Sequence, residues 1–213
     1  MINLSFNSAY QYTPDQKRVI KSLKKKYGKK FQKPFGKSKK MVWYDGQANV
    51  IAIKHEISKK VLWESRFRCT FCGKRLEGSS KPIDHFIPNS KYPQYSFHPL
   101  NLLSSCSYCN SDSKGEFDPI VTTHRKYTKI VFSIVHPIVD NVVNEFRYQP
   151  DGVNFDLPNC SAKAKKLIDL FNWTTLEHQL SRSEQQTIEL FNPISDADLL
   201  TLVNQCATYR PKK

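Results

Sequence analysis

Two Cys-x-x-Cys pairs are the residues of this sequence whose types and spacing indicate chemistry most directly. Cys69 and Cys72 form the first pair, and Cys106 and Cys109 form the second after a gap of 33 residues. Each such turn directs two sulfurs at one ion, and two turns complete a tetrahedral four-cysteine site whose usual occupant is zinc. The gap leaves room for a hairpin, so the spacing predicts a structural zinc site built around one.

The alternative is that the cysteines form two disulfides or two unrelated pairs. No signal peptide opens the sequence, so we expect a cytoplasmic, reducing location that disfavours disulfides. Cys160 and Cys206 remain after the four are assigned, and we expect them to be ordinary core thiols.

A second set of polar residues lies between and after the two pairs. It consists of Asp84, His85, Asn101 and Asn110. Imidazole has an unperturbed pKa of about 6.5, which suits a general base at neutral pH. Carboxylate and amide oxygens suit a hard divalent ion such as Mg²⁺. Together these residues form a small polar set able to hold and use a second metal.

The whole ordered pattern resembles the HNH (ββα-metal) endonuclease family. It runs Cys-x-x-Cys, Asp-His-x-x-Pro, Asn-Leu, Cys-x-x-Cys-Asn and then Lys-Gly. The resemblance implies that His85 is the general base and that Asp84 and Asn110 hold the catalytic Mg²⁺ or Mn²⁺. It also implies that Asn101 orients the loop carrying the base and does not bind the metal.

Three nearby residues depart from this pattern or lie outside it. Lys114 follows Asn110 by four residues, whereas in many members of the family the lysine follows by three. We expect it to contact phosphate without being catalytic. Asp112 is a competing metal ligand, and His98 is expected to be structural or, at most, a phosphate contact.

The fold predicted from these patterns is α+β, with a ββα-metal core and its four-cysteine zinc site flanked by N-terminal and C-terminal helices. Within the core, strands are expected over Lys74–Glu77 and Pro82–Phe86, with a helix from Cys106–Asn110. Helices are also expected over residues 14–27 and 48–64 from an N-cap and an apolar stripe. The expected regions are a basic N-terminal extension (1–65), the nuclease core (66–118) and a mainly helical C-terminal region (119–213).

Positive charge is concentrated at the start of the chain. Residues 1–75 hold 19 of the 33 Lys and Arg residues but only four of the 19 Asp and Glu residues. Such asymmetry favours a polyanionic partner, with a solubilising basic tail as the alternative. The lysines expected to bind nucleic acid are Lys24, Lys25, Lys29, Lys30, Lys39, Lys40 and Lys114.

The second half resembles, more narrowly, HNH proteins encoded beside an ATPase in Septu-type and retron-associated anti-phage systems. The matching features are Pro137 with Asp140, a turn at Asp151-Gly152, Phe171-Asn172 at a helix end, and Arg182. The resemblance implies an ATPase partner and a role in bacterial defence. Apolar stripes and caps predict helices starting near Ala164, at a capping box Thr174–Glu177, and at Ser195–Asp198.

The sequence thus favours a metal-dependent endonuclease acting on DNA, with an RNA such as tRNA as the alternative substrate. It contains no run of eighteen apolar residues, so no membrane span is expected. The rival hypothesis is a non-catalytic zinc module that binds nucleic acid or serves as an adaptor for the ATPase. A third hypothesis is a nuclease that stays silent until its partner activates it.

Overall fold

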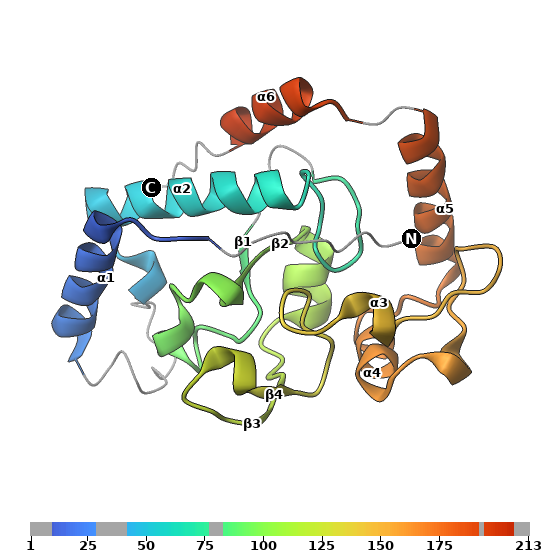
Figure 1. Cartoon of the computed structure of the whole chain (residues 1–213), viewed down its shortest axis with the longest axis horizontal. Helices are drawn as coiled ribbons and strands as arrows, with labels where there is room; N and C mark the ends of the chain where they lie inside the picture. Colours follow the sequence, from blue (N-terminus) through green and yellow to red (C-terminus); the bar gives the residue numbers. More distant parts are fainter. Residues whose placement is uncertain (1–9, 29–41, 77–82, 192–193, 207–213) are drawn as a thin grey trace.

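The computed structural model describes residues 10–28, 42–76, 83–191 and 194–206 (Figure 1). The helices are α1 (Pro14–Tyr27), α2 (Ala48–Glu64), α3 (Val142–Glu145), α4 (Ala162–Leu170), α5 (Leu176–Phe191) and α6 (Asp196–Cys206). The strands are β1 (Ile83–His85), β2 (Leu102–Ser104), β3 (Ile120–Thr122) and β4 (Val131–Phe132). A π-helix, η5, spans Tyr108–Lys114, and short 3-10 turns include η2 (Val42–Tyr44), η3 (Pro93–Tyr95), η4 (Pro99–Asn101), η6 (Tyr127–Lys129) and η7 (Leu157–Asn159).

The predicted α+β class and the flanking helices are confirmed. Within the described ranges, no helix combines the length and the apolar character that crossing a membrane requires.

Helix α1 begins and ends where its sequence signals predict. The Thr13 side chain accepts a hydrogen bond from the Gln16 backbone N–H, and the Gln16 side chain accepts one from the Thr13 backbone N–H. The two bonds form a capping box. Pro14 occupies the first turn, where its missing N–H is not needed. Gly28 ends the helix with a positive φ of 51°, a conformation that favours glycine.

Helix α2 connects the N-terminal part to the core. It contacts α1, β2 and α6, and Figure 1 shows it running alongside α6 above the β1–β2 pair. Its buried residues include Val50, Ile53, Ile57 and Val61, the stripe that predicted the helix. After α2, Arg66 and Phe67 take positive φ values of 48° and 58°, which turn the chain toward Cys69.

The ββα order is present, but one of its strands differs from the prediction. Strand β1 pairs antiparallel with β2, with Asp84 opposite Leu103 and His85 opposite Leu102. The strand expected over Lys74–Glu77 is wrong for its described part, since only Arg75 pairs, in a single bridge to Arg68. The physical reason is burial: Leu102 and Leu103 lie in the two hydrophobic clusters and make β2 the better partner.

Two hydrophobic clusters meet at the β1–β2 pair. Adjacent strand residues face opposite sides, so Leu103 packs in the larger cluster and Leu102 in the smaller one. The smaller cluster joins α1, α2 and η2 to Phe97.

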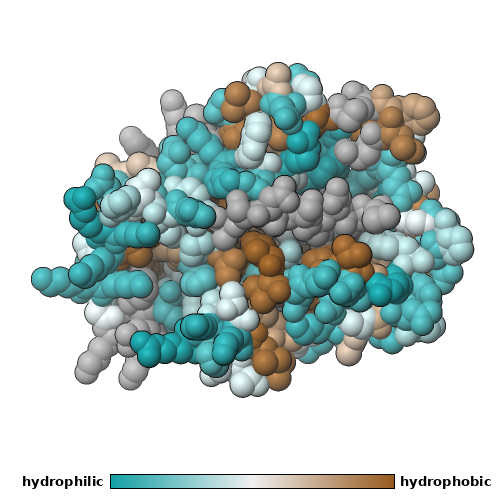
Figure 2. Space-filling view, viewed as in Figure 1, coloured by the Kyte–Doolittle hydropathy of each residue, from teal (hydrophilic) through white to brown (hydrophobic). Residues whose placement is uncertain are grey.

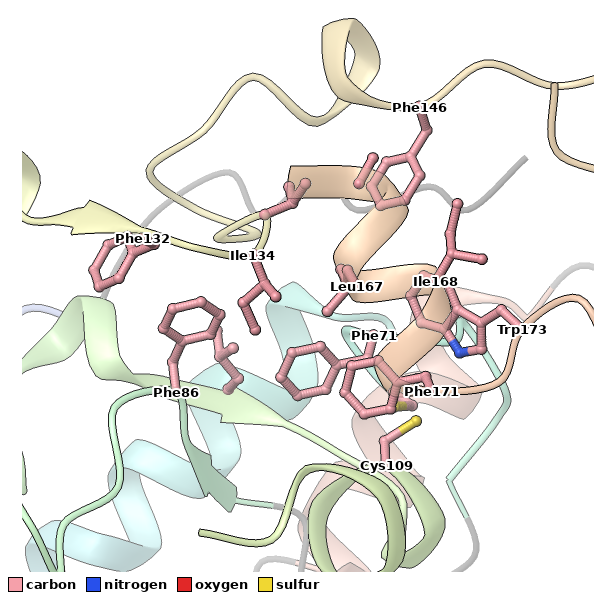
Figure 3. Close-up of a cluster of buried hydrophobic side chains, with 14 of the residues drawn as sticks. Phe71, Phe86, Cys109, Phe132, Ile134, Phe146, Leu167, Ile168, Phe171 and Trp173 are labelled. Atoms are coloured by element: carbon pink, nitrogen blue, oxygen red, sulfur yellow. The ribbon is translucent and has the colours of Figure 1, made fainter. Parts of the chain in front are cut away.

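The larger cluster joins the first cysteine pair to the C-terminal half (Figure 3). Phe71 lies between Cys69 and Cys72 in the sequence and packs on Phe171, with ring centroids 5.1 Å apart. Phe171 in turn stacks on Trp173 at 5.3 Å. The segment around the cysteines and the C-terminal helices therefore share one core, while the division into three regions stays a prediction.

The C-terminal helices largely match their predicted positions. Helix α4 is capped by Ser161, whose side chain accepts from the Ala164 backbone. Helix α5 begins at Leu176, so its start lies later than a capping box at Thr174 would place it. The Ser195 side chain accepts from the Asp198 backbone at 3.1 Å, as expected for the start of α6.

Candidate functional site

The four cysteines come together in a geometry that can hold zinc. Their sulfurs all lie within 4.8 Å of one another, and the Sγ atoms of Cys72 and Cys106 are 3.9 Å apart. Sulfurs about 2.3 Å from one zinc ion in a tetrahedral site are separated by about 3.8 Å, so the cluster fits zinc. The free-thiol state of Cys69, Cys72, Cys106 and Cys109 excludes the predicted alternative of two disulfides in this structure.

The backbone holds the first cysteine turn against β2. The Gly73 N–H donates to the Cys69 carbonyl at 2.8 Å, and Gly73 has a φ of 77°, which a residue with a side chain adopts only under strain. The Thr70 N–H donates to the Ser104 carbonyl at 2.8 Å. The four-cysteine cluster is therefore anchored to the same hairpin that carries Asp84 and His85.

Asp84 is buried on the face of β1 that meets the larger cluster. It is 4% exposed, and its Oδ1 accepts a 3.0 Å hydrogen bond from Lys114 Nζ. Its other oxygen, Oδ2, is buried without a hydrogen-bond partner. Burial raises the pKa of the Asp84 carboxyl, and the Lys114 ammonium opposes that rise. An unsatisfied buried carboxylate oxygen is an acceptor that a cation or a water can satisfy.

Lys114 lies inside the protein rather than on its surface. It is 3% exposed and ends the π-helix that begins at Tyr108. The Gly115 N–H donates to the Asn110 carbonyl at 2.9 Å, five residues back, which is the π-helical pattern. A π-turn accommodates one more residue than an α-turn, so it accounts for the four-residue spacing between Asn110 and Lys114. A phosphate contact from Lys114 would require it to leave Asp84.

His85 is positioned as a neutral imidazole with one nitrogen left to accept a proton. It is 8% exposed, and its Nε2 lies 3.0 Å from the Ser96 carbonyl oxygen. A carbonyl only accepts, so Nε2 carries the proton and Nδ1 keeps its lone pair. Burial lowers the pKa of His85 to about 4, and the Lys114 ammonium adds to the decrease. The ring is therefore neutral at pH 7, with its one proton on Nε2.

Trp43 supports His85 and carried no signal in the sequence. Its ring meets the His85 ring edge-on, with centroids 4.7 Å apart, and it contacts Phe97 at 5.0 Å. Lys54 on α2 donates to the Trp43 carbonyl at 3.1 Å. Only the folded chain brings α2, η2 and the loop after β1 together, so no local pattern could have revealed this support.

Asn101 fastens the loop that follows His85. Its Oδ1 accepts from the Ile87 N–H at 2.7 Å and from the Tyr127 hydroxyl at 2.8 Å. Its Nδ2 donates to the carbonyls of Ile87 and Tyr95, each at 3.1 Å. The oxygen and the nitrogen of the side-chain amide each make two hydrogen bonds, and the residue is fully buried. This arrangement is typical of a positioning residue rather than a metal ligand. Tyr127 is a further member that the sequence did not indicate.

The two remaining acidic or amide candidates differ in exposure. Asn110 is half-buried and lies in the same π-helix as Lys114, which contacts Asp84. Asp112 is exposed to solvent. The helix therefore favours Asn110 over Asp112 as a residue facing the interior.

The predicted nucleic-acid contacts are only partly within the described residues. Lys24 and Lys25 are exposed on α1, and Figure 2 shows hydrophilic side chains over that helix at the left edge of the view. The other lysines predicted from the N-terminal third lie outside the described residues; they are Lys29, Lys30, Lys39 and Lys40.

One segment of the chain matches a known protein family. Residues 69–116 match the family model described as HNH endonuclease. This segment includes the four cysteines, Asp84, His85 and Lys114.

Two curated relatives match larger parts of the chain. Protein ea31 of Escherichia phage lambda is 36% identical over 95 residues, which cover 45% of this chain and 28% of the relative. Septu protein PtuB of Bacillus thuringiensis is 29% identical over 126 residues, which cover 58% of this chain and 43% of the relative. The chain thus spans less than half the length of each relative. No solved structure matches significantly.

Proposed function

We propose, from the premise that residues 69–116 of this chain are an HNH endonuclease domain, that the protein is a metal-dependent endonuclease. The observation that carries this proposal is the state of His85. It is a buried, neutral imidazole whose Nε2 proton is held by the Ser96 carbonyl, which leaves Nδ1 as a base in the residue next to Asp84 in β1.

The chain's own residues divide the work of hydrolysis. His85 Nδ1 accepts a proton from the attacking water, and Ser96 and Trp43 fix the ring in the orientation that this requires. Asn101 fixes the loop after His85 through four hydrogen bonds, so the base does not have to be ordered at each turnover.

A divalent ion, Mg²⁺ or Mn²⁺, fits the residues beside His85. Asp84 Oδ2 is a buried acceptor without a partner, and Asn110 would offer its amide oxygen from the neighbouring helix. When bound, the ion supplies positive charge for the phosphate oxygens and the leaving group. The four-cysteine cluster would hold a structural zinc ion with no open position.

The proposed substrate is DNA, and an RNA such as tRNA is the alternative that the same chemistry allows. The basic N-terminal third supports a polyanionic substrate, because lysines neutralise phosphates without reading sequence. Similarity to Septu protein PtuB supports a place in a bacterial anti-phage defence system with an ATPase partner.

Cleavage assays would test this function directly. Purified protein is incubated with plasmid DNA or total tRNA, with Mg²⁺ or Mn²⁺ added or omitted, beside the His85→Ala variant. Zinc content and melting temperature are measured for both proteins, because an inactive variant is informative only if its fold persists. We expect metal-dependent cutting by the wild type and a loss of at least about 100-fold in the variant.

Two other outcomes have definite meanings. Cutting that His85→Ala retains would contradict the assignment of the base. A zinc-loaded wild type that cuts nothing is tested again with an ATPase subunit and nucleotide. His85-dependent cutting then identifies a partner-activated nuclease, and continued inactivity favours a non-catalytic binding module.

A further inference from the structure

A cleft lies between α1 and the segment that precedes β2. Its volume is about 360 Å³. The lining residues are Tyr12, Lys17, Ile20, Lys21, Lys24, Gln94, Phe97, His98 and Pro99. We call it the α1 cleft. None of the residues assigned above to metal binding or proton transfer lines it.

The cationic side of the α1 cleft is one face of a helix. Lys17, Lys21 and Lys24 are spaced by four and three residues, so they share a face of α1. Lys17 and Lys21 are both exposed. Among the residues that the structure describes, none that lines the cleft is acidic, so the three ammonium groups give it a positive potential.

The opposite side of the α1 cleft is apolar and well fixed. Phe97 is 4% exposed, and its carbonyl accepts a 2.8 Å hydrogen bond from the Tyr12 hydroxyl. The Oε1 of Gln94 is buried without a hydrogen-bond partner. His98 stacks on Tyr127 with centroids 4.2 Å apart, and its Nδ1 accepts from the Leu100 N–H at 3.3 Å, which places the proton on Nε2.

The α1 cleft adjoins the support of His85. Ser96, whose carbonyl holds the His85 ring, directly precedes the cleft residues Phe97 and His98. Trp43 contacts both the Phe97 ring and the His85 ring. A group bound in the cleft is therefore separated from His85 by one layer of side chains.

We propose that the α1 cleft binds one nucleotide of the substrate strand near the cleavage position, with its phosphate on Lys17, Lys21 and Lys24. Its sugar and base lie against Ile20 and Pro99, which are both half-buried. Cations with an apolar or aromatic floor are the features that hold a single strand without sequence readout. This inference rests on the proposed function for the identity of the strand.

Binding assays test the α1 cleft without depending on cleavage. The probe is a short fluorescein-labelled DNA oligonucleotide, single-stranded or duplex, titrated with protein in a His85→Ala background without added divalent ions. Lys17→Glu/Lys21→Glu is compared with Lys165→Glu/Lys166→Glu on α4, which changes the net charge equally at the opposite end of the molecule (Figure 1). Ile20→Trp fills the cleft without changing charge.

We expect the cleft charge variant to lose at least about tenfold in affinity and to reduce the salt-dependence slope by about two, while the α4 variant stays near the parent. Ile20→Trp is expected to weaken single-strand binding several-fold at an unchanged melting temperature. If Ile20→Trp melts early, Gln94→Trp replaces it as the filling variant.

Equal losses in the two charge variants would overturn the proposal, because only overall charge would then matter. Full affinity in a folded filling variant would overturn it as well. A failure of the nuclease proposal would be seen in the cleavage assay instead. Cleavage would be absent or independent of His85, whatever the oligonucleotide affinities are.

Discussion

The Asp84 carboxylate and the Lys114 ammonium form a buried ion pair at the place where a divalent ion is proposed to bind. Lys114 Nζ occupies one carboxylate oxygen, and the second oxygen is left for another cation. Removing one member of such a pair leaves an uncompensated charge in a dry interior, which is costly, whereas removing both is far less so. Lys114 therefore lets the interior tolerate Asp84 before any metal is bound.

We predict that Lys114→Met lowers the free energy of unfolding by about 3 kcal/mol or more, because Asp84 would be left buried without its cation. Combining it with Asp84→Asn should restore most of that stability. Urea denaturation of the two single variants and the double variant measures the coupling. Strictly additive losses would show that the pair does not interact in solution.

We predict that Asn101→Ala lowers stability by at least about 3 kcal/mol, because several buried groups each lose a hydrogen bond at once. These groups are the N–H and carbonyl of Ile87, the Tyr95 carbonyl and the Tyr127 hydroxyl. Asn144→Ala, at an exposed position of α3, is the control and should stay within about 0.5 kcal/mol of the parent. Similar denaturation midpoints for both variants would contradict the positioning role.

At the scale of secondary-structure elements, the four-cysteine cluster fastens the turn before β1 to the helix after β2. We predict that Cys106→Ser abolishes stoichiometric zinc binding and lowers the melting temperature, because three remaining thiolates hold zinc less tightly. Tryptophan emission should shift to longer wavelength as the shared core loosens, because one of the three tryptophans, Trp173, lies in that core and is 1% exposed. Mass-spectrometric metal analysis and fluorescence measure the two effects.

Cys160→Ser is the matched control for that experiment. Cys160 is likewise a free thiol and is buried, but it lies outside the four-cysteine cluster and its sulfur accepts from the Arg147 N–H at 3.3 Å. It should keep its zinc. Equal zinc loss in both variants would mean that general destabilisation, rather than ligand removal, releases the metal.

Elements set by local chemistry were predictable from the sequence, and those set by distant partners were not. Helix α1 follows from Thr13, Pro14 and Gly28, which are adjacent to the residues that they cap. Strand β2 could not be identified locally, because its pairing with β1 spans a long loop and depends on two hydrophobic clusters. The π-helix could not be predicted locally either. Its extra residue is explained only by the contact between Lys114 and Asp84, which are distant in the sequence.

At the scale of the whole molecule, the larger hydrophobic cluster makes the C-terminal helices part of the support for the cysteines. We predict that Phe171→Ala costs about 3–5 kcal/mol and accelerates zinc release to a chelator, because Phe171 packs on Phe71 between two cysteines. Leu180→Ala, at a position that is 55% exposed, should change neither. Slow zinc release from a destabilised Phe171→Ala protein would show that the two halves are independent.

The candidate site was predictable to the same extent as the fold. The order of cysteines, Asp84, His85 and the asparagines indicated which residues to examine, because these residue types carry the chemistry themselves. The residues that orient them could not be found in the same way: Trp43, Ser96 and Tyr127 act through contacts that exist only after folding.

The contact between Phe71 and Phe171 also has a consequence for synthesis on the ribosome. A translating ribosome adds about 5–20 residues per second, so Phe71 emerges several seconds before the ring that covers it. During that interval, the nascent chain presents an uncovered aromatic side chain between two metal-binding thiols. Zinc acquisition and complete folding of residues 69–116 are therefore expected to finish only after the segment that carries Phe171 has left the exit tunnel.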